Sequence, residues 1–300
     1  MNFYLFDFRR SKYIFFLAAI FLLFLLGKMI FHENISLTAA RNLSGWTRLS
    51  VYDTPILSRD PGRYENLRLG IATIHNQALI PGQIFSFNQV SGPYEEVLGW
   101  RSAKKSMVVG SELQDSIGGG VCQITATLYN AALLADLTVK ERHPHNVVSS
   151  YVAPGRDSAV WYEGDLNLVF ANKHDFPLII KADIKDKKVV VEIWGRGEKA
   201  AQWKSNNQIS IRTEKNGRLP FEEFTRGDSS LEAGKKRVDV QGKCGYKKVS
   251  VWRISQSKEG RKEELISVDS YQPLNQRVSL GSNQSLPVLG HLETIWQKLK

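Results

Sequence analysis

A thiol, two imidazoles and a run of glycines lie close together in the middle of this sequence. Cys122 follows three consecutive glycines with only Val121 between them, and His143 and His145 come later in the same central segment. A thiolate is a strong nucleophile, and an imidazole within reach of a thiol acts as the base that removes its proton. The combination predicts a cysteine site that attacks a carbonyl carbon.

The residues after Cys122 predict a helix that begins at the thiol. Ile124, Leu128 and Ala131 are apolar and follow one another at helical spacing. The unpaired amides at the start of a helix favour an anion, so this position lowers the pKa of a thiol from its usual value of about 8.5. The amides of Cys122 and Gln123 are candidates for stabilising an oxyanion.

The glycine run has two interpretations. Gly118, Gly119 and Gly120 have no Cβ, so the backbone can approach a substrate closely there. The same three residues are also typical of a tight turn between a strand and a helix, with no part in chemistry.

The His-Pro-His segment supplies the candidate base. His143 and His145 are two residues apart, so on a strand both would face the same way, and Pro144 would stiffen the pair. One imidazole would act as the base and the other would contact substrate, with Asp157 orienting the base. The alternative is a rigid structural corner whose imidazoles bond to the backbone.

Two arginines flank this candidate site. Arg142 precedes the first histidine, and Arg156 precedes Asp157. A guanidinium binds a carboxylate through two parallel hydrogen bonds, so both residues are candidates for substrate binding. A solvated surface role is the other interpretation.

Two further arrangements of the thiol remain open. Cys122, His143, His145 and a carboxylate could hold zinc, although the paired spacing usual in structural zinc sites is missing. Cys122 could also pair with Cys244, the second cysteine of the chain. We expect a free thiol, no metal and no cofactor.

The elements around the site predict an α+β fold. A helix is expected over 66–79, strands over 83–88 and 105–109, and several more strands between 160 and 194. The central helix would begin at the glycine-rich turn and pack on a mainly antiparallel sheet. The expected domain limits are 66–195 for this domain, 196–236 for a loop-rich linker and 237–300 for a basic, β-rich tail.

The N-terminus predicts a membrane anchor. Residues 13–31 are apolar except for Lys28, and this stretch is nearly the roughly 20 residues that span a bilayer. Basic residues in 1–12 would keep that end cytoplasmic, and a juxtamembrane segment, 32–65, would follow. We expect a single-pass protein of the cell membrane with an extracellular C-terminal domain. A signal peptide cleaved after 38–40 is the rival interpretation.

The charge of the chain favours anionic partners. The formal net charge is +10 at pH 7. A basic surface attracts polyanions such as nucleic acid, lipid headgroups and wall polymers. Because the chain is expected to be exported, nucleic acid is excluded as a partner, and anionic wall polymers remain.

Six segments between Gln83 and Gly195 carry a family resemblance. They are Phe85–Asn88, Val90–Pro93, Ile117–Gln123, Thr127–Leu133, Glu141–His145 and Tyr151–Asp157. In order and spacing these segments resemble the VanW family, which is named from a vancomycin-resistance cluster. The family commonly has Ser-Thr-Thr after the Cys-Gln pair and Ser after the second His, whereas this chain has Thr125-Ala126-Thr127 and Asn146.

The resemblance implies a protein of the cell envelope. It implies a cysteine-dependent acyltransferase of the L,D-transpeptidase type, with peptidoglycan stem peptides as substrate and the cysteine as nucleophile. The C-terminal tail is loosely similar to a G5 module, a type associated with cell-wall or glycan binding. A non-catalytic peptidoglycan-binding or vancomycin-resistance accessory protein is the alternative function.

Overall fold

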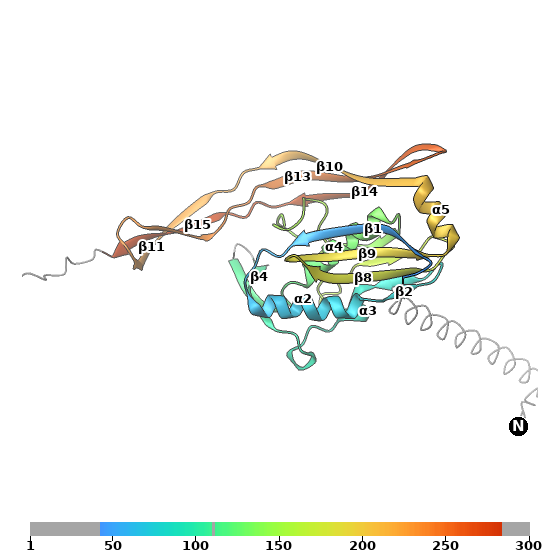
Figure 1. Ribbon diagram of the computed structural model, residues 1–300. Coiled ribbons are helices and arrows are strands. Elements are labelled where there is room, and N and C mark those ends of the chain that lie inside the picture. Colours follow the sequence, from blue (N-terminus) through green and yellow to red (C-terminus); the bar gives the residue numbers. More distant parts are fainter. Residues whose placement is uncertain (1–42, 110–111, 284–300) are drawn as a thin grey trace, which may run out of the picture.

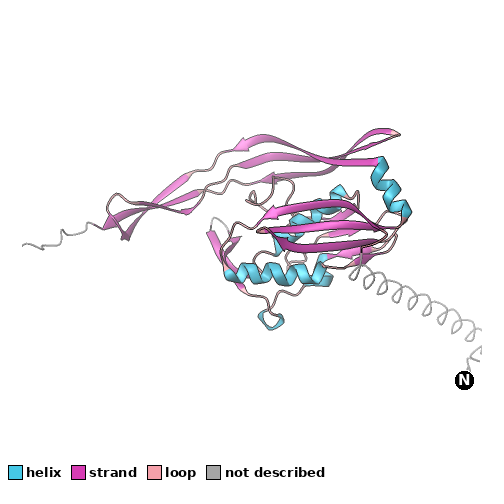
Figure 2. Ribbon diagram, viewed as in Figure 1, coloured by secondary structure: helices cyan, strands magenta, loops and turns pink. Residues whose placement is uncertain are grey.

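The computed structural model describes residues 43–109 and 112–283 (Figure 1). These residues form fifteen strands and five helical segments, two of which are short. The α+β class expected from the sequence is therefore wrong, because the described part of the chain is mostly β (Figure 2).

The first sheet forms the centre of the N-terminal part. It has four antiparallel strands, and its long middle strands alternate buried and exposed residues, which leaves one face for helices to cover. Its order is β1 (Trp46–Pro55), β9 (Lys188–Arg196), β8 (Leu178–Lys185) and β2 (Ala78–Leu79).

Two helices of the same length pack on this sheet. α4 (Val121–Leu134) contacts β1 and β9, and α2 (Pro61–Ile74) contacts β8. Nearly every side chain of α4 is buried, including four polar ones, so this helix lies inside the core. Asp60 caps α2 by accepting a hydrogen bond from the backbone N–H of Arg63 at 2.8 Å.

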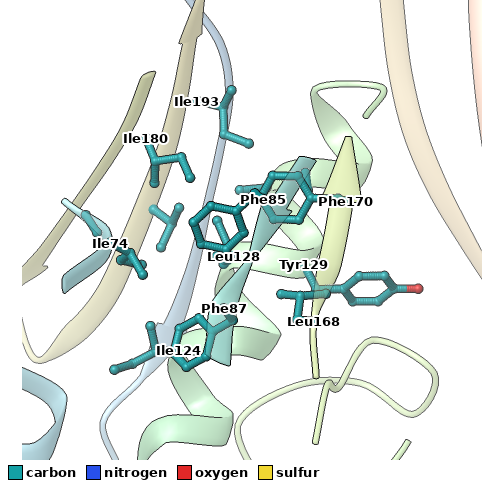
Figure 3. Close-up of a cluster of buried hydrophobic side chains, with 14 of the residues drawn as sticks. Ile74, Phe85, Phe87, Ile124, Leu128, Tyr129, Leu168, Phe170, Ile180 and Ile193 are labelled. Atoms are coloured by element: carbon teal, nitrogen blue, oxygen red, sulfur yellow. The ribbon is translucent and has the colours of Figure 1, made fainter. Parts of the chain in front are cut away.

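The core lies between the sheet and smaller elements. Leu128 of α4 packs beside Phe85 and Phe170, whose rings stack with centroids 4.8 Å apart (Figure 3). The smaller elements are β3 (Ile84–Ser86), α3 (Phe87–Ser91), η1 (Glu96–Leu98), the hairpin β4 (Ser102–Val109) and β5 (Glu112–Ile117), β6 (Thr138–Glu141) and β7 (Val169–Ala171).

The C-terminal part is an extended β module. α5 (Glu198–Asn206) leads from β9 into a long three-stranded sheet that runs alongside the first part and continues into a second three-stranded sheet (Figure 1). The first sheet has the order β10 (Asn207–Leu219), β13 (Gly245–Ser257), β14 (Gly260–Tyr271), and the second β11 (Glu223–Glu232), β15 (Gln276–Asn283), β12 (Lys236–Val240).

The segment 196–236 explains much of the error in fold class. It was expected to be loop-rich because it is polar, but it contains α5, β10 and β11. Most side chains of β10 and β11 are exposed, so these strands are held by backbone pairing and show no apolar alternation.

The membrane prediction also needs correction. No helix within 43–109 or 112–283 is long and apolar enough to cross a membrane. This finding goes against the predicted location as a single-pass protein of the cell membrane and against the membrane as a partner. The apolar segment 13–31 and the stretch 1–12 lie outside the described residues, and the described part of 32–65 contains β1.

Candidate functional site

The three glycines make the turn between β5 and α4. Gly118 and Gly120 have φ of +73° and +115°, a region that residues with a side chain rarely adopt. A Cβ on Gly120 would lie 3.2 Å from Arg63 Cγ. All three glycines are buried, so their position fits the turn interpretation better than contact with a substrate.

The turn places Cys122 in the first turn of α4, facing His145, which in turn contacts Asp157. His145 Nδ1 lies 2.7 Å from Asp157 Oδ2, and the His145 side chain is close enough to the Cys122 thiol for each to shift the pKa of the other. Since Nδ1 is bonded to Asp157, Nε2 is the ring nitrogen left for the thiol. Cys122 Sγ additionally lies 3.6 Å from the carbonyl oxygen of Val160. Thiol, imidazole and carboxylate thus form one series of interacting groups, with the imidazole in the middle.

The surroundings of Cys122 favour its thiolate. Burial raises the pKa of the Cys122 thiol, but the hydrogen bond and positive charge of His145, with a smaller effect of Arg63, outweigh burial and leave the pKa below its ordinary value. Burial of His145 lowers its pKa, but the bonds to Asp157 and Cys122 raise it to about 10. Both shifts favour a thiolate–imidazolium pair.

Asp157 is held by four donors. Its Oδ2 accepts from the backbone N–H and the ring of His145, and its Oδ1 accepts from Arg142 at 3.0 Å and from the Tyr271 hydroxyl at 2.5 Å. Burial raises the pKa of Asp157, but the bonds of His145, the charge of Arg142 and the bond of Tyr271 bring it below the usual range. The carboxylate is therefore charged and fixed in orientation.

His143 is not part of this series. β6 ends at Glu141, so the two-residue alternation of a strand does not extend to the second histidine. His143 Nε2 lies 2.9 Å from Glu141 Oε1, at a partly exposed position. The structure brings His145 to the thiol and places His143 at a different group.

The side chain of Gln123 holds elements together. Its amide nitrogen donates to Thr54 Oγ1 at 3.1 Å and to the Pro55 carbonyl at 2.9 Å, and its oxygen accepts from Arg63. The backbone N–H of Gln123 donates to the Gly120 carbonyl at 2.9 Å, so it is already engaged.

The two flanking arginines are engaged inside the protein. Arg142 donates to Asp157 and to Asp269 Oδ2, the latter at 2.6 Å, and its side chain is only 4% exposed. Arg156 donates to Asn130 Oδ1 and lies over the ring of Tyr52. The described geometry gives both residues internal partners in place of a substrate carboxylate.

Four residues near the thiol were not among the candidate site residues taken from the sequence. Three of them interact electrostatically with Cys122 and therefore lie around the sulfur: Arg63, Tyr94 and Tyr151. Tyr271 reaches Asp157 from the distant strand β14. The loose G5 resemblance of the C-terminal tail gave no sign that a residue of this tail reaches the site.

The sequence left two other arrangements open for Cys122, a disulfide with Cys244 and a zinc site. Both Cys122 and Cys244 are free, so the disulfide does not form. Within residues 43–109 and 112–283, no group of three or more His, Cys, Asp or Glu side chains is arranged to hold a metal ion.

Comparison with protein families matches two separate regions of the chain. Residues 62–194 match the family described as VanW like protein, and residues 210–283 match the G5 domain. The chain carries a VanW-like domain followed by a G5 domain. The VanW-like domain holds Cys122, His145 and Asp157, and the G5 domain holds Tyr271.

Two curated relatives are similar to about half of the chain. One is the uncharacterized protein YoaR of Bacillus subtilis, 33% identical over 147 residues, which are 49% of this chain and 48% of that protein. The other is the vancomycin B-type resistance protein VanW of Enterococcus faecalis, 26% identical over 181 residues, 56% of this chain and 62% of the relative. The matched regions span about half to three fifths of these relatives.

Two solved structures are similar to a quarter of the chain. The G5 domain of IgA1 protease is 25% identical and covers 26% of this chain and 94% of that chain, with a TM-score of 0.17. HP0197-G5 is 28% identical and covers 25% and 97%, with a TM-score of 0.14.

Proposed function

We propose that this protein is a cell-envelope cysteine acyltransferase of the L,D-transpeptidase type that acts on peptidoglycan stem peptides. The observation that carries the proposal is the series of interacting groups from Cys122 through His145 to Asp157. A thiol, a base and a group that orients the base are what acyl transfer through a thioester requires. The VanW-like domain and the resistance protein among its relatives support a role in the cell envelope.

In the first half-reaction the Cys122 thiolate attacks the carbonyl carbon of a stem-peptide amide. The C–N bond breaks, the acyl group remains on sulfur as a thioester, and the imidazolium of His145 gives its proton to the leaving amine. The Cys122 backbone N–H, in the first turn of α4, is the donor proposed for the oxyanion. Asp157 keeps the His145 ring in the required tautomer throughout.

In the second half-reaction an amine of another stem peptide attacks the thioester. His145 accepts the proton of that amine, the new amide forms, and the Cys122 thiolate is released. Attack by water would give hydrolysis, so the acceptor must displace water from the sulfur. His145 is 26% exposed, which leaves one edge of the ring open to a reactant.

Aromatic side chains next to the thiol supply a surface for the donor. Trp161 and Tyr162 directly follow Val160, whose carbonyl lies against Cys122, and both are exposed at 58% and 42%. Tyr162 lies 6.4 Å from Tyr94 between ring centroids. Exposed rings pack on the apolar stems and sugar faces of a wall fragment at low entropic cost.

The test is product formation from purified stem peptides. Wild-type protein should form a cross-linked dimer, Cys122→Ala should form none, and Cys244→Ala should match wild type because Cys244 interacts with Arg218 and is not a member of the Cys122–His145–Asp157 series. If Cys122→Ala forms dimer at the wild-type rate, or wild type forms none with any stem peptide, the proposal fails.

A second, non-catalytic function is favoured by the distal end of the G5 domain. Phe224, Arg226 and Arg277 line a hollow of ≈ 450 Å³ there, with Phe224 52% exposed. An aromatic ring with two guanidinium groups suits an anionic wall polymer. Arg226→Ser should reduce cosedimentation with purified cell wall, more at low salt than at high salt. Equal binding by wild type and variant at low salt would exclude this site.

A further inference from the structure

The hydroxyl of Tyr271 is fixed by two hydrogen bonds. Its oxygen accepts from the Gly155 backbone N–H at 2.7 Å and lies 2.5 Å from Asp157 Oδ1. Because an N–H can only donate, the hydroxyl proton must point to Asp157. Tyr271 is fully buried, so water does not replace either bond. A residue of the G5 domain therefore contacts the carboxylate that holds His145.

A second contact from the same strand reaches the same carboxylate through Arg142. Asp269 lies two residues before Tyr271 on β14, so both side chains point to the same face. Arg142 joins Asp269 Oδ2, at 2.6 Å, to Asp157 Oδ1, at 3.0 Å. The guanidinium also lies 5.3 Å from the ring centroid of Tyr129 in α4, which fixes it against the core.

β13 and β14 pack closely against the loop that contains Gly155. Gly155 has φ of +82°, and a Cβ there would lie 2.5 Å from Val251 Cγ2 of β13, so only glycine fits. The Gln272 N–H donates to the Asn146 carbonyl at 2.7 Å, directly after His145. The two C-terminal strands therefore contact the backbone near Asp157, at Gly155, and the backbone next to His145, at Asn146.

We propose that β14 of the G5 domain is a positioning element of the candidate active site, with Tyr271 orienting Asp157 and Asp269 acting through Arg142. The site is complete only when the G5 domain is seated on the VanW-like domain. This inference rests on the proposed thiol chemistry of Cys122. It assigns the C-terminal domain a second role beside any binding to the wall.

The pH dependence of Cys122 alkylation by iodoacetamide tests this role without any peptide substrate. Tyr271→Phe removes a donor from Asp157, which makes the potential at the site more negative and loosens the imidazolium. Both effects raise the pKa of Cys122, which also faces His145, Arg63, Tyr94 and Tyr151. The pH midpoint of the alkylation rate should rise by about half a pH unit, and the alkylation rate at pH values below that midpoint should fall about three-fold.

The controls separate positioning from folding. Tyr246→Phe is the matched control, because Tyr246 pairs with Tyr271 across β13 and β14 and lies over Lys215. Tyr246→Phe should leave the midpoint unchanged. In an Asp157→Asn background Tyr271→Phe should cause no further shift, since the residue through which it acts is gone.

A second variant keeps the test decisive if Tyr271→Phe folds poorly. Replacement of Tyr271 by 3-fluorotyrosine keeps the size and both bonds but makes the hydroxyl a stronger donor, so the midpoint should fall. An unchanged midpoint in both variants, or the same shift with and without Asp157, would overturn the inference. Because alkylation needs no stem peptide, these results stand apart from a failure of transpeptidation.

Discussion

His145 Nδ1 lies 2.7 Å from Asp157 Oδ2, and the side chain of Asp157 is 1% exposed. This contact occupies Nδ1 and therefore leaves Nε2 as the ring nitrogen for Cys122. A charged carboxylate on Nδ1 favours the imidazolium, and the imidazolium in turn favours the thiolate. The chemistry proposed for the site depends on this single relationship, and the predictions below test its parts.

Alkylation of Cys122 should show a lowered thiol pKa. The midpoint of the alkylation rate against pH is expected below the ordinary value of about 8.5, because His145 stabilises the thiolate. His145→Gln removes that charge and should raise the midpoint by about one unit or more. His143→Gln is the matched control and should not move it, since His143 pairs with Glu141. Equal shifts in the two variants would contradict the geometry.

Transpeptidation should be confined to a pH window set by the same pair. As pH falls through the lowered pKa of Cys122, the thiolate is protonated and the rate drops. As pH rises through about 10, His145 loses the proton that the leaving amine needs. The measurement is kcat/KM against pH with a stem-peptide donor. A rate that keeps rising above pH 10 would show that an imidazolium is not required.

Arg142→Gln should destabilise the protein strongly. Arg142 is 4% exposed and compensates both Asp157 and Asp269, so its loss leaves buried Asp269 without its counter-charge and leaves Asp157 with that of His145 alone. Breaking a buried pair costs about 3–5 kcal/mol of unfolding free energy. Arg48→Gln, which breaks the more exposed pair with Glu192, should cost about 1 kcal/mol or less. Urea unfolding measures both, and similar losses in the two variants would contradict the role of Arg142.

Gly120→Ala should destabilise the start of α4. Gly120 has φ of +115°, and the added Cβ would lie 3.2 Å from Arg63 Cγ. A non-glycine residue at positive φ costs about 1–2 kcal/mol. Gly227→Ala is the control, because Gly227 lies in β11 with only Ser282 Oγ near, at 3.9 Å. If Gly120→Ala lowers the thermal unfolding temperature no more than Gly227→Ala does, the turn is not strained as described.

The sequence predicted the local part of the site better than its long-range part. A helix beginning near Cys122 follows from apolar spacing, and α4 has that position. His145 and Asp157 were candidates because of their residue types and spacing. The choice between His143 and His145 depended on where β6 ends, which alternation does not determine.

The contribution of the G5 domain could not be predicted from local patterns. Tyr271 and Asp269 are more than a hundred residues from Asp157 and Arg142, and only the packing of β14 against the loop at Gly155 brings them together. The strands β10 and β11 were missed for a related reason. Their side chains are mostly exposed, so pairing between distant strands, and not burial, defines them.

The most direct test of the central claim is the intact mass of the protein after incubation with a purified stem-peptide donor. We predict a covalent adduct with the mass of the donor acyl group on wild-type protein, located at Cys122 by peptide mapping and absent in Cys122→Ala. An acyl adduct elsewhere on the chain, or none at any donor concentration while Cys122 still reacts with iodoacetamide, would contradict the proposed acyl transfer.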